Sequence, residues 1–287
     1  MSPDQFTDWL ARKSQSSGHT TFEKPLIMGV LNVTSDSFFD GGKYVSMDKA
    51  CEHAFNLIAQ GVDIIDIGGE STKPGAEQVA LETELNRIVP VIRQIRLHSD
   101  ICISIDTYKP EAMEAAVNAG ANIINDIYAL RKDGALAMAA KLAVPICLMH
   151  MKGQPNNMQH NPLYPDGVMA ELKQFFIERI AACKKAGINQ KHLILDPGFG
   201  FGKLVNNNLH MLYNLDDFKF FEAPILLGVS RKSTIGAVLD KEADERLVGS
   251  ISIAVYAALK GVSILRTHDV NETNQALQMI DAIYKAG

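Results

Sequence analysis

The sequence predicts an α/β fold with one domain, a (β/α)8 TIM barrel, and three observations lead to this prediction. Eight short apolar runs punctuate the 287 residues, and helix-like segments lie between them. Most of the runs are continuously apolar, which is typical of parallel strands that are buried on both faces. The connections from helix to strand are mostly short, whereas those from strand to helix are often long. Repeated units of this kind in a chain of this length fit a closed barrel better than a doubly wound sheet.

The expected elements follow from these runs and from the residues that end them. We expect strands at Pro25–Leu31, Val62–Ile67, Ile101–Ile105, Asn122–Asn125, Val144–Met149, His192–Leu195, Pro224–Val229 and Val262–Leu265. One helix should begin at Pro110 and end at Gly120, because proline suits the first helical turn and glycine suits the left-handed position after the last. Another should cover Val168–Cys183, where apolar residues recur with the helical period. Glycine closes four helix-like segments in the same way: Gly61, Gly120, Gly187 and Gly261.

One domain accounts for residues 25–287, because no linker or low-complexity tract interrupts them. Residues 1–24 form an N-terminal extension that lacks the apolar segment of a secretory signal. The longest apolar stretch, near Ile251–Leu265, is interrupted by Lys260 and Gly261 and is therefore unsuited to span a bilayer. We expect a cytoplasmic protein with no membrane partner.

The composition narrows the classes of function. A net charge of −5 argues against a general nucleic-acid-binding protein, which would carry a basic face. The four cysteines include no C-x-x-C pair, so neither a zinc site nor a disulfide framework is predicted. Cys102 and Cys147 lie within apolar runs, and we expect them to be buried thiols. His150 has no His or Cys partner at metal-ligand spacing, so no metal site is expected around it.

Polar residues stand where the predicted strands end. In a barrel these ends and the loops after them form one rim, which carries the catalytic residues. The strand ends bring to this rim Asn32, Asp66, Asp106, Asn125–Asp126, His150, Asp196, Ser230–Ser233 and Arg266–His268. Polar strand ends also occur by chance, because each strand must give way to a loop. A polar residue at the end of every strand favours a functional rim.

The acceptor half of this rim consists of Asp106, Asn125 and Asp196. Carboxylate and amide oxygens suit the edge of an aminopyrimidine-like ring, whose ring N–H and exocyclic NH2 groups are donors. Met149, the last residue of its strand, should pack under such a flat ring. The alternative is that the two carboxylates are structural and pair with Lys232 or Arg266.

The cationic half consists of Lys232, Arg266 and His268. The last two strands commonly supply a phosphate site in such barrels. Ser233 should open the next helix, whose N-terminal amides favour an anion. The alternative is that these residues are rim charges in solvent.

The glycine-rich segment 196–203 reads DPGFGFGK. Its glycines alternate, so it lacks the spacing of a dinucleotide-binding fingerprint. Pro197 and Leu204 stand where a phosphate-binding P-loop requires glycine and serine or threonine. We interpret the segment as a tight loop that faces a ligand, with Phe199 as an aromatic wall.

Eight of these stretches together form a recognisable pattern. They are Asn32–Gly42, Gly69–Ala76, Ser104–Lys109, Ile124–Asp126, Leu148–Met151, Asp196–Lys203, Ser230–Ser233 and Arg266–Val270. In this order they resemble the dihydropteroate synthase family, which joins a pterin to p-aminobenzoate in folate biosynthesis. The resemblance covers the chain from Pro25 to the C-terminus. One stretch alone would be weak evidence, whereas the joint pattern is specific.

The resemblance implies a role for each part of the rim. The pterin site would consist of Asp106, Asn125, Ile127, Met149, Asp196, Phe199 and Lys232. The p-aminobenzoate site would consist of Thr72, Lys73, Pro74, Phe199, Lys232 and Ser233. The pyrophosphate would lie on Asn32, Thr72, Arg266 and His268, with a Mg²⁺ cofactor on Asn32. The implied catalytic residues are Asp106, Lys232, Arg266 and His268.

The resemblance also implies that the partners are two small-molecule substrates and a second copy of the chain in a homodimer. The C-terminal helices, expected at Leu247–Lys260 and Glu272–Lys285, carry apolar positions suited to such an interface. The same positions suit packing against the barrel, and we expect most of them to do so.

The family's first two strand-end loops are mobile and close over the substrates. Three residues depart from the family pattern: Ser35 stands for proline, Phe39 for serine and Lys73 for arginine. We expect the first two to alter closure of the first loop. Lys73 keeps the charge and lacks the bidentate fork of arginine. These departures bear on affinity, loop motion and sulfonamide sensitivity more than on the type of reaction.

Two other functions would use the same predicted pterin acceptors. One is a corrinoid-linked methyltransferase domain, in which the cationic half of the rim would be superfluous. The other is a non-catalytic pterin-binding paralogue that acts through a partner, in which Asn32 and Arg266 would be superfluous.

Overall fold

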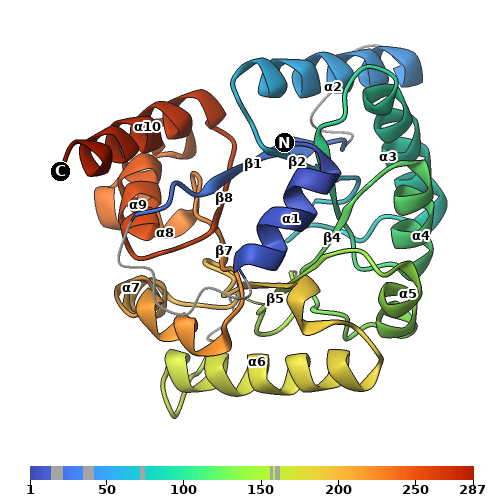
Figure 1. Cartoon of the computed structure of the whole chain (residues 1–287). Coiled ribbons are helices and arrows are strands. Elements are labelled where there is room, and N and C mark those ends of the chain that lie inside the picture. Colours follow the sequence, from blue (N-terminus) through green and yellow to red (C-terminus); the bar gives the residue numbers. More distant parts are fainter. Residues whose placement is uncertain (14–21, 35–41, 72–74, 156–157, 159–161) are drawn as a thin grey trace.

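The computed structural model describes residues 1–13, 22–34, 42–71, 75–155, 158 and 162–287, and it confirms the predicted barrel (Figure 1). The eight strands are Leu26–Asn32 (β1), Ile64–Gly68 (β2), Cys102–Asp106 (β3), Ile123–Asp126 (β4), Ile146–Met149 (β5), Leu193–Asp196 (β6), Leu226–Gly228 (β7) and Ile264–Thr267 (β8). Their bounds differ from the predicted ones by at most two residues. β1 and β5 begin directly after Pro25 and Pro145, because proline has no N–H group for the ladder.

Helices surround the strand ring, and one lies across its amino end (Figure 1). The α-helices in the described residues are Pro3–Lys13 (α1), Gly42–Ala59 (α2), Leu81–Arg96 (α3), Pro110–Ala119 (α4), Ala135–Leu142 (α5), Val168–Lys185 (α6), Val205–Tyr213 (α7), Ser233–Leu239 (α8), Leu247–Leu259 (α9) and Val270–Ala286 (α10). The glycines predicted to close helices, at 61, 120, 187 and 261, all have positive φ, between 84° and 120°. Among the described residues, no helix combines the length and the apolar character that crossing a membrane requires.

Parallel pairing joins the strands in the order β6-β5-β4-β3-β2-β1-β8-β7. The ring is nearly closed, because a bridge between Leu195 and Ile225 connects the β6 and β7 edges. The backbone N–H of Leu195 donates to the carbonyl of Pro224 at 3.0 Å across this seam. All eight strands therefore direct their carboxyl ends toward the same rim.

Side chains along each strand alternate between the outer shell and the barrel interior. Outward residues such as Ile65 and Ile103 pack with the helices in one large cluster. Inward residues such as Ile64 and Cys102 form a separate apolar cluster. Two residues farther along their strands, the inward positions hold Asp66, Ser104, Asn125, Asp196 and Arg266. The interior is therefore apolar at its amino end and polar at its carboxyl end.

Helix α1 closes the amino end of the barrel. Phe6, Trp9 and Leu10 recur on one helical face, are buried, and pack in the inward apolar cluster with Ile64 and Ile264. The N–H of Cys102 donates to the carbonyl of Met1 at 2.8 Å. Figure 1 shows α1 lying across the middle of the strand ring. Residues 1–13, which we expected to belong to an N-terminal extension, thus form the floor of the barrel.

We predict that Phe6→Ala lowers the free energy of unfolding by about 3–5 kcal/mol, because it opens a cavity between α1 and the strands. Urea unfolding followed by the fluorescence of Trp9, the one tryptophan of the chain, measures this loss directly. Asp8→Ala on the exposed face of α1 is the matched control and should change stability by less than about 0.5 kcal/mol. Equal effects of the two substitutions would show that α1 does not pack as described.

Candidate functional site

Arg266 lies inside the barrel and brings the two predicted halves of the rim together. Its Nε donates to Asp66 Oδ2 at 2.7 Å, and its Nη2 donates to Asp106 Oδ2 at 3.1 Å. The side-chain amide of Asn125 donates to the same Asp66 oxygen at 3.2 Å. Four strands thus deliver acceptors and a cation to one place. Asp106 pairs with Arg266, as the structural alternative for this carboxylate predicts.

Asp66 is the member of this group to which the sequence analysis gave no role. Its side chain is fully buried, and its Oδ1 has no hydrogen-bond partner among the described residues. A buried carboxylate oxygen without a partner is costly, and a donor group of a bound molecule would satisfy it. The signal that could have found it is strand register, because Asp66 follows the inward Ile64 by two residues.

The Asp106 carboxyl holds its proton more tightly than a free carboxyl does. Burial and then the carboxylate of Asp66 raise the pKa of Asp106, and the guanidinium of Arg266 opposes this shift only in part. The two carboxylates share one cation where little water reaches them. Such a group changes its charge readily when a ligand brings donors or positive charge to it.

Asp196 stands at the end of β6, where the glycine-rich loop begins. Its Oδ1 accepts a hydrogen bond from the N–H of Gly198 at 2.7 Å. Gly198 and Gly202 have φ of 67° and 63°, and a Cβ on them would lie 1.9 Å and 2.2 Å from the carbonyl oxygens of His150 and Lys152. The glycines are therefore required by close packing of this loop on the end of β5.

Lys232, after β7, reaches across to the same loop. Its Nζ donates to the carbonyl of Phe199 at 2.5 Å and lies 4.6 Å from the ring centroid of Phe201. Burial lowers the pKa of Lys232 to about 8, although the carboxylate of Asp196 opposes the shift. The loop thus holds this cation with a backbone oxygen and an aromatic face.

We expected Phe199 to be the aromatic wall of this loop, but Phe201 is the more exposed of the two rings. The Phe199 ring is fully buried and packs in the outer cluster with the helices. Phe201 is only partly buried and packs on a smaller apolar cluster. That cluster contains Ile127, Tyr128, Met149, Met151 and Met158. The predicted apolar pterin contacts, Ile127 and Met149, therefore lie together beside Phe201.

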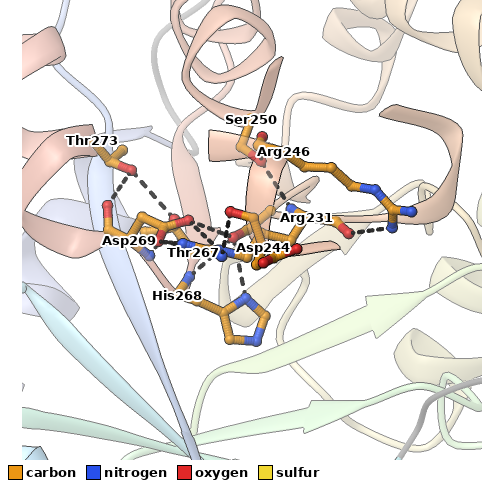
Figure 2. Close-up of polar contacts among 9 residues, drawn as sticks. Arg231, Asp244, Arg246, Ser250, Thr267, His268, Asp269 and Thr273 are labelled. Carbon is orange, nitrogen blue, oxygen red and sulfur yellow. Dashed lines mark hydrogen bonds and ion pairs between the residues drawn. The ribbon is translucent and has the colours of Figure 1, made fainter. Parts of the chain in front are cut away.

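Arg231, the residue before Lys232, forms an ion pair with Asp269 (Figure 2). Its Nη2 donates to Asp269 Oδ1 at 2.6 Å, and its N–H donates to Ser250 Oγ at 2.9 Å. Its φ of 58° is unusual for a residue with a side chain. This turn presents Lys232 to the loop after β6 and lets Ser233 open α8, as predicted.

His268 marks the outer edge of the cationic half. The side chain is exposed, and its Nδ1 lies 3.1 Å from the hydroxyl of Ser230 (Figure 2). Arg266 lies on β8, Lys232 follows β7 and both are partly buried, whereas His268 is exposed.

The predicted residues Thr72, Lys73 and Pro74, and the departures Ser35 and Phe39, lie outside the described residues. The two ends of the segment that contains the first three are nevertheless fixed by Lys109. Its Nζ donates to Glu70 Oε2 at 2.6 Å, to the carbonyl of Val79 at 2.7 Å and to Glu84 Oε2 at 2.5 Å. This buried ion cluster anchors the connection between β2 and α3 to the end of β3.

A metal site made of side chains alone is not evident. In the described ranges, no group of three or more His, Cys, Asp or Glu side chains is arranged to hold an ion. Burial and the charge of Lys203 lower the pKa of His150 to about 3, so its imidazole is neutral.

The chain is similar to proteins of one family. The model of the pterin binding enzymes matches residues 28–268. Dihydropteroate synthase of Escherichia coli K12 is 49% identical over 262 residues, which cover 91% of this chain and 93% of that protein. The solved Yersinia pestis dihydropteroate synthase with a sulfonamide drug is 45% identical, with a TM-score of 0.86 over 92% of this chain and 95% of that one. The Xanthomonas albilineans enzyme with 4-aminobenzoic acid is 44% identical, with a TM-score of 0.85 over 91% and 93%.

We predict that Asp106→Asn changes how stability depends on pH. Because its pKa is raised, folded Asp106 keeps a proton that the unfolded chain releases above about pH 4, so the stability from this group is lost as the pH rises. Asparagine keeps the shape and does not ionise. The variant should therefore gain stability relative to the parent chain between about pH 5 and about pH 8 in urea unfolding curves. A constant difference over this range would contradict the raised pKa.

Proposed function

Because the chain belongs to the pterin binding enzyme family, and within it to the dihydropteroate synthases, we propose how its rim residues divide the work of that reaction. The chain joins 6-hydroxymethyl-7,8-dihydropterin pyrophosphate to p-aminobenzoate, which gives 7,8-dihydropteroate and pyrophosphate in folate biosynthesis. The observation that best supports this assignment is the contact between the two halves of the rim: Arg266 donates hydrogen bonds to both Asp66 and Asp106 at the carboxyl end of the barrel.

The acceptor half would hold the pterin ring. Asp106, Asn125 and Asp196 supply buried oxygens for the ring N–H and NH2 donors, and each group left unpaired there would cost about 1–3 kcal/mol. Asp66 would orient this set, because it accepts from both Asn125 and Arg266. Ile127 and Met149 would provide the apolar surface beside the ring.

As the substrate bonds change, positive charge develops beside the acceptor half of the rim and negative charge beside the cationic half. When the C–O bond to pyrophosphate breaks, positive charge develops on the pterin methylene and the ring, and the Asp106 carboxylate would stabilise it. The amine of p-aminobenzoate forms the new C–N bond and then loses a proton. No strong base is needed, because an arylamine is weakly basic. Arg266 and His268 would neutralise the leaving pyrophosphate.

The residues present fit a Mg²⁺ ion bound mainly through substrate and water. A Cβ on Gly68 would lie 3.7 Å from Asn32 Oδ1 and 3.8 Å from Asp106 Oδ2, so the amide oxygen of Asn32 stands beside the reaction site. Mg²⁺ prefers oxygen ligands and keeps several waters, so one amide suffices. When bound, the ion supplies charge neutralisation to the leaving group.

The p-aminobenzoate site would lie between Lys232 and Phe201. The ammonium of Lys232 and the start of α8 at Ser233 suit a carboxylate, and the Phe201 ring suits the aromatic ring. Thr72, Lys73 and Pro74 remain part of this proposal, since the ends of their segment are anchored beside β3 by Lys109. A solved relative holds 4-aminobenzoic acid.

We further propose that two copies form a homodimer through α9. Most apolar residues of α9 are buried or half-buried, as expected for packing on the barrel, and Val248, Tyr256 and Leu259 are exposed. Its buried positions are small, namely Ser250, Ala254, Ala257 and Ala258. Val248 is 74% exposed and Leu259 is 48% exposed. A second copy would remove this apolar face from water.

We place the protein in the cytoplasm. The four cysteines are free and buried, and burial raises the pKa of the Cys51, Cys102, Cys147 and Cys183 thiols, which suits a reducing compartment. The partners would then be the two small substrates and a second copy, without nucleic acid or membrane.

The purified chain should release pyrophosphate only with both substrates and Mg²⁺ present, in a coupled pyrophosphate assay. Asp196→Ala should weaken binding of a pterin that lacks pyrophosphate by about tenfold or more in calorimetry, because it leaves ring donors unpaired. The exposed Asp217→Ala is the matched control. Unchanged pterin affinity in Asp196→Ala would refute the role of Asp196. Pterin binding without turnover in the parent chain would instead favour the non-catalytic alternative.

Val248→Glu should weaken the dimer by about 100-fold or more, because it places an unpaired charge in an apolar interface. Sedimentation velocity of the 31.4 kDa chain distinguishes the two states. Leu97→Glu, at an equally exposed leucine away from α9, should leave the dimer intact. A parent chain that sediments as a monomer would contradict the proposal.

A further inference from the structure

Lys203 is a buried cation to which none of the roles above gives a task. Its side chain is 2% exposed, and its Nζ donates to the carbonyls of Gly198 and Phe201 at 2.9 Å and 3.2 Å. The Nδ1 of the neutral His150 ring lies 2.9 Å from the same ammonium. All three partners are uncharged, so backbone and imidazole acceptors hold this cation in place of an ion pair. Burying a lysine in this way is costly.

The two carbonyls belong to the glycine-rich loop that follows β6. Phe199 lies between them in the sequence, and its own carbonyl accepts the hydrogen bond of Lys232. Phe201, whose carbonyl Lys203 binds, presents its ring to the same Lys232 ammonium. Lys203 therefore fixes the backbone on both sides of the oxygen that holds Lys232.

The loop needs such a brace because its three glycines give the backbone high conformational freedom. Gly198, Gly200 and Gly202 alternate with the phenylalanines, and glycine loses more conformational entropy on ordering than any other residue. The charged groups around Lys203 are Asp196, Lys232, Glu171 and Lys152, and burial lowers the pKa of Lys203 to about 7. Because Lys203 Nζ is buried, water does not compete for its hydrogen bonds to the loop carbonyls, which strengthens them.

We propose that Lys203 is a positioning residue that braces this loop. The brace keeps the Phe199 carbonyl in place to accept the hydrogen bond from Lys232. It also keeps the Phe201 ring in place along one side of the p-aminobenzoate site. The inference rests on the proposed function for the assignment of Lys232 and Phe201 to that substrate. Asp196 depends less on the brace, because the β5–β6 ladder places it opposite Met149. Loss of the brace therefore affects p-aminobenzoate more than the pterin.

The test uses two variants of the full chain. Lys203→Met keeps the length of the side chain and removes its hydrogen-bond donor. Lys203→Gln restores a donor on a shorter side chain. In Lys203→Met the KM for p-aminobenzoate should rise about tenfold, and the KM for the pterin pyrophosphate should change less than about twofold. Lys203→Gln should recover part of the loss. Lys152→Met is the matched control. Lys152 is a second lysine near Lys203, and its ammonium pairs with Glu171, which lies outside the loop.

Hydrogen exchange of a peptide covering residues 197–204 gives a readout that needs no turnover. Exchange should rise in Lys203→Met and stay at the parent level in Lys152→Met. Unchanged exchange overturns the proposal, whether or not the parent chain is active. A fall in kcat with both KM values unchanged, or an equal rise in both KM values, also overturns it. An inactive parent with faster exchange in Lys203→Met would refute the proposed function and leave the brace established.

Discussion

Two buried carboxylates, Asp66 and Asp106, share the guanidinium of Arg266, and the polar half of the barrel interior depends on this contact. Without the cation, two acids from neighbouring strands would face each other where water is scarce, and one of them would have to stay protonated. The guanidinium reduces this repulsion only in part, so Asp106 holds its proton more tightly than a free carboxyl does. Positive charge that develops on a substrate beside Asp106 would favour release of this proton.

The strands and the loops contribute to the site in different ways. Asp106, Asn125 and Asp196 are placed by strand register, so their positions follow from the ladder itself. Lys232 is placed by the turn after β7, which the pair of Arg231 with Asp269 fixes. Separately, Lys109 anchors the connection after β2. Acceptors and Arg266 on strands, with Lys232 on a loop, suit a reaction in which the pterin binds deep and the second substrate arrives nearer the surface.

The strands and the rim could be predicted because continuous apolar runs and helix-closing glycines are local signals. Asp66 was also placed on the rim as a strand end. Its pairing with Arg266 and Asn125 was not predicted, because it depends on contacts between strands that are far apart in the sequence. The choice between Phe199 and Phe201 was not local. It depends on left-handed glycines that turn the backbone between them, and on the end of β5 against which the loop packs. The role of α1 depended likewise on partners spread over every strand.

The floor formed by α1 bears on how the chain reaches its native state. In the sequence this helix precedes every strand, yet the surface that it covers includes Ile264 of β8, the last strand. The apolar face of α1 can therefore be fully buried only after β8 has been synthesised. Docking of α1 on the strands then joins segments that are far apart in the sequence. During synthesis that face would be exposed to chaperones and to other nascent chains. Trp9, buried only after the last strand joins, would report the final step of assembly.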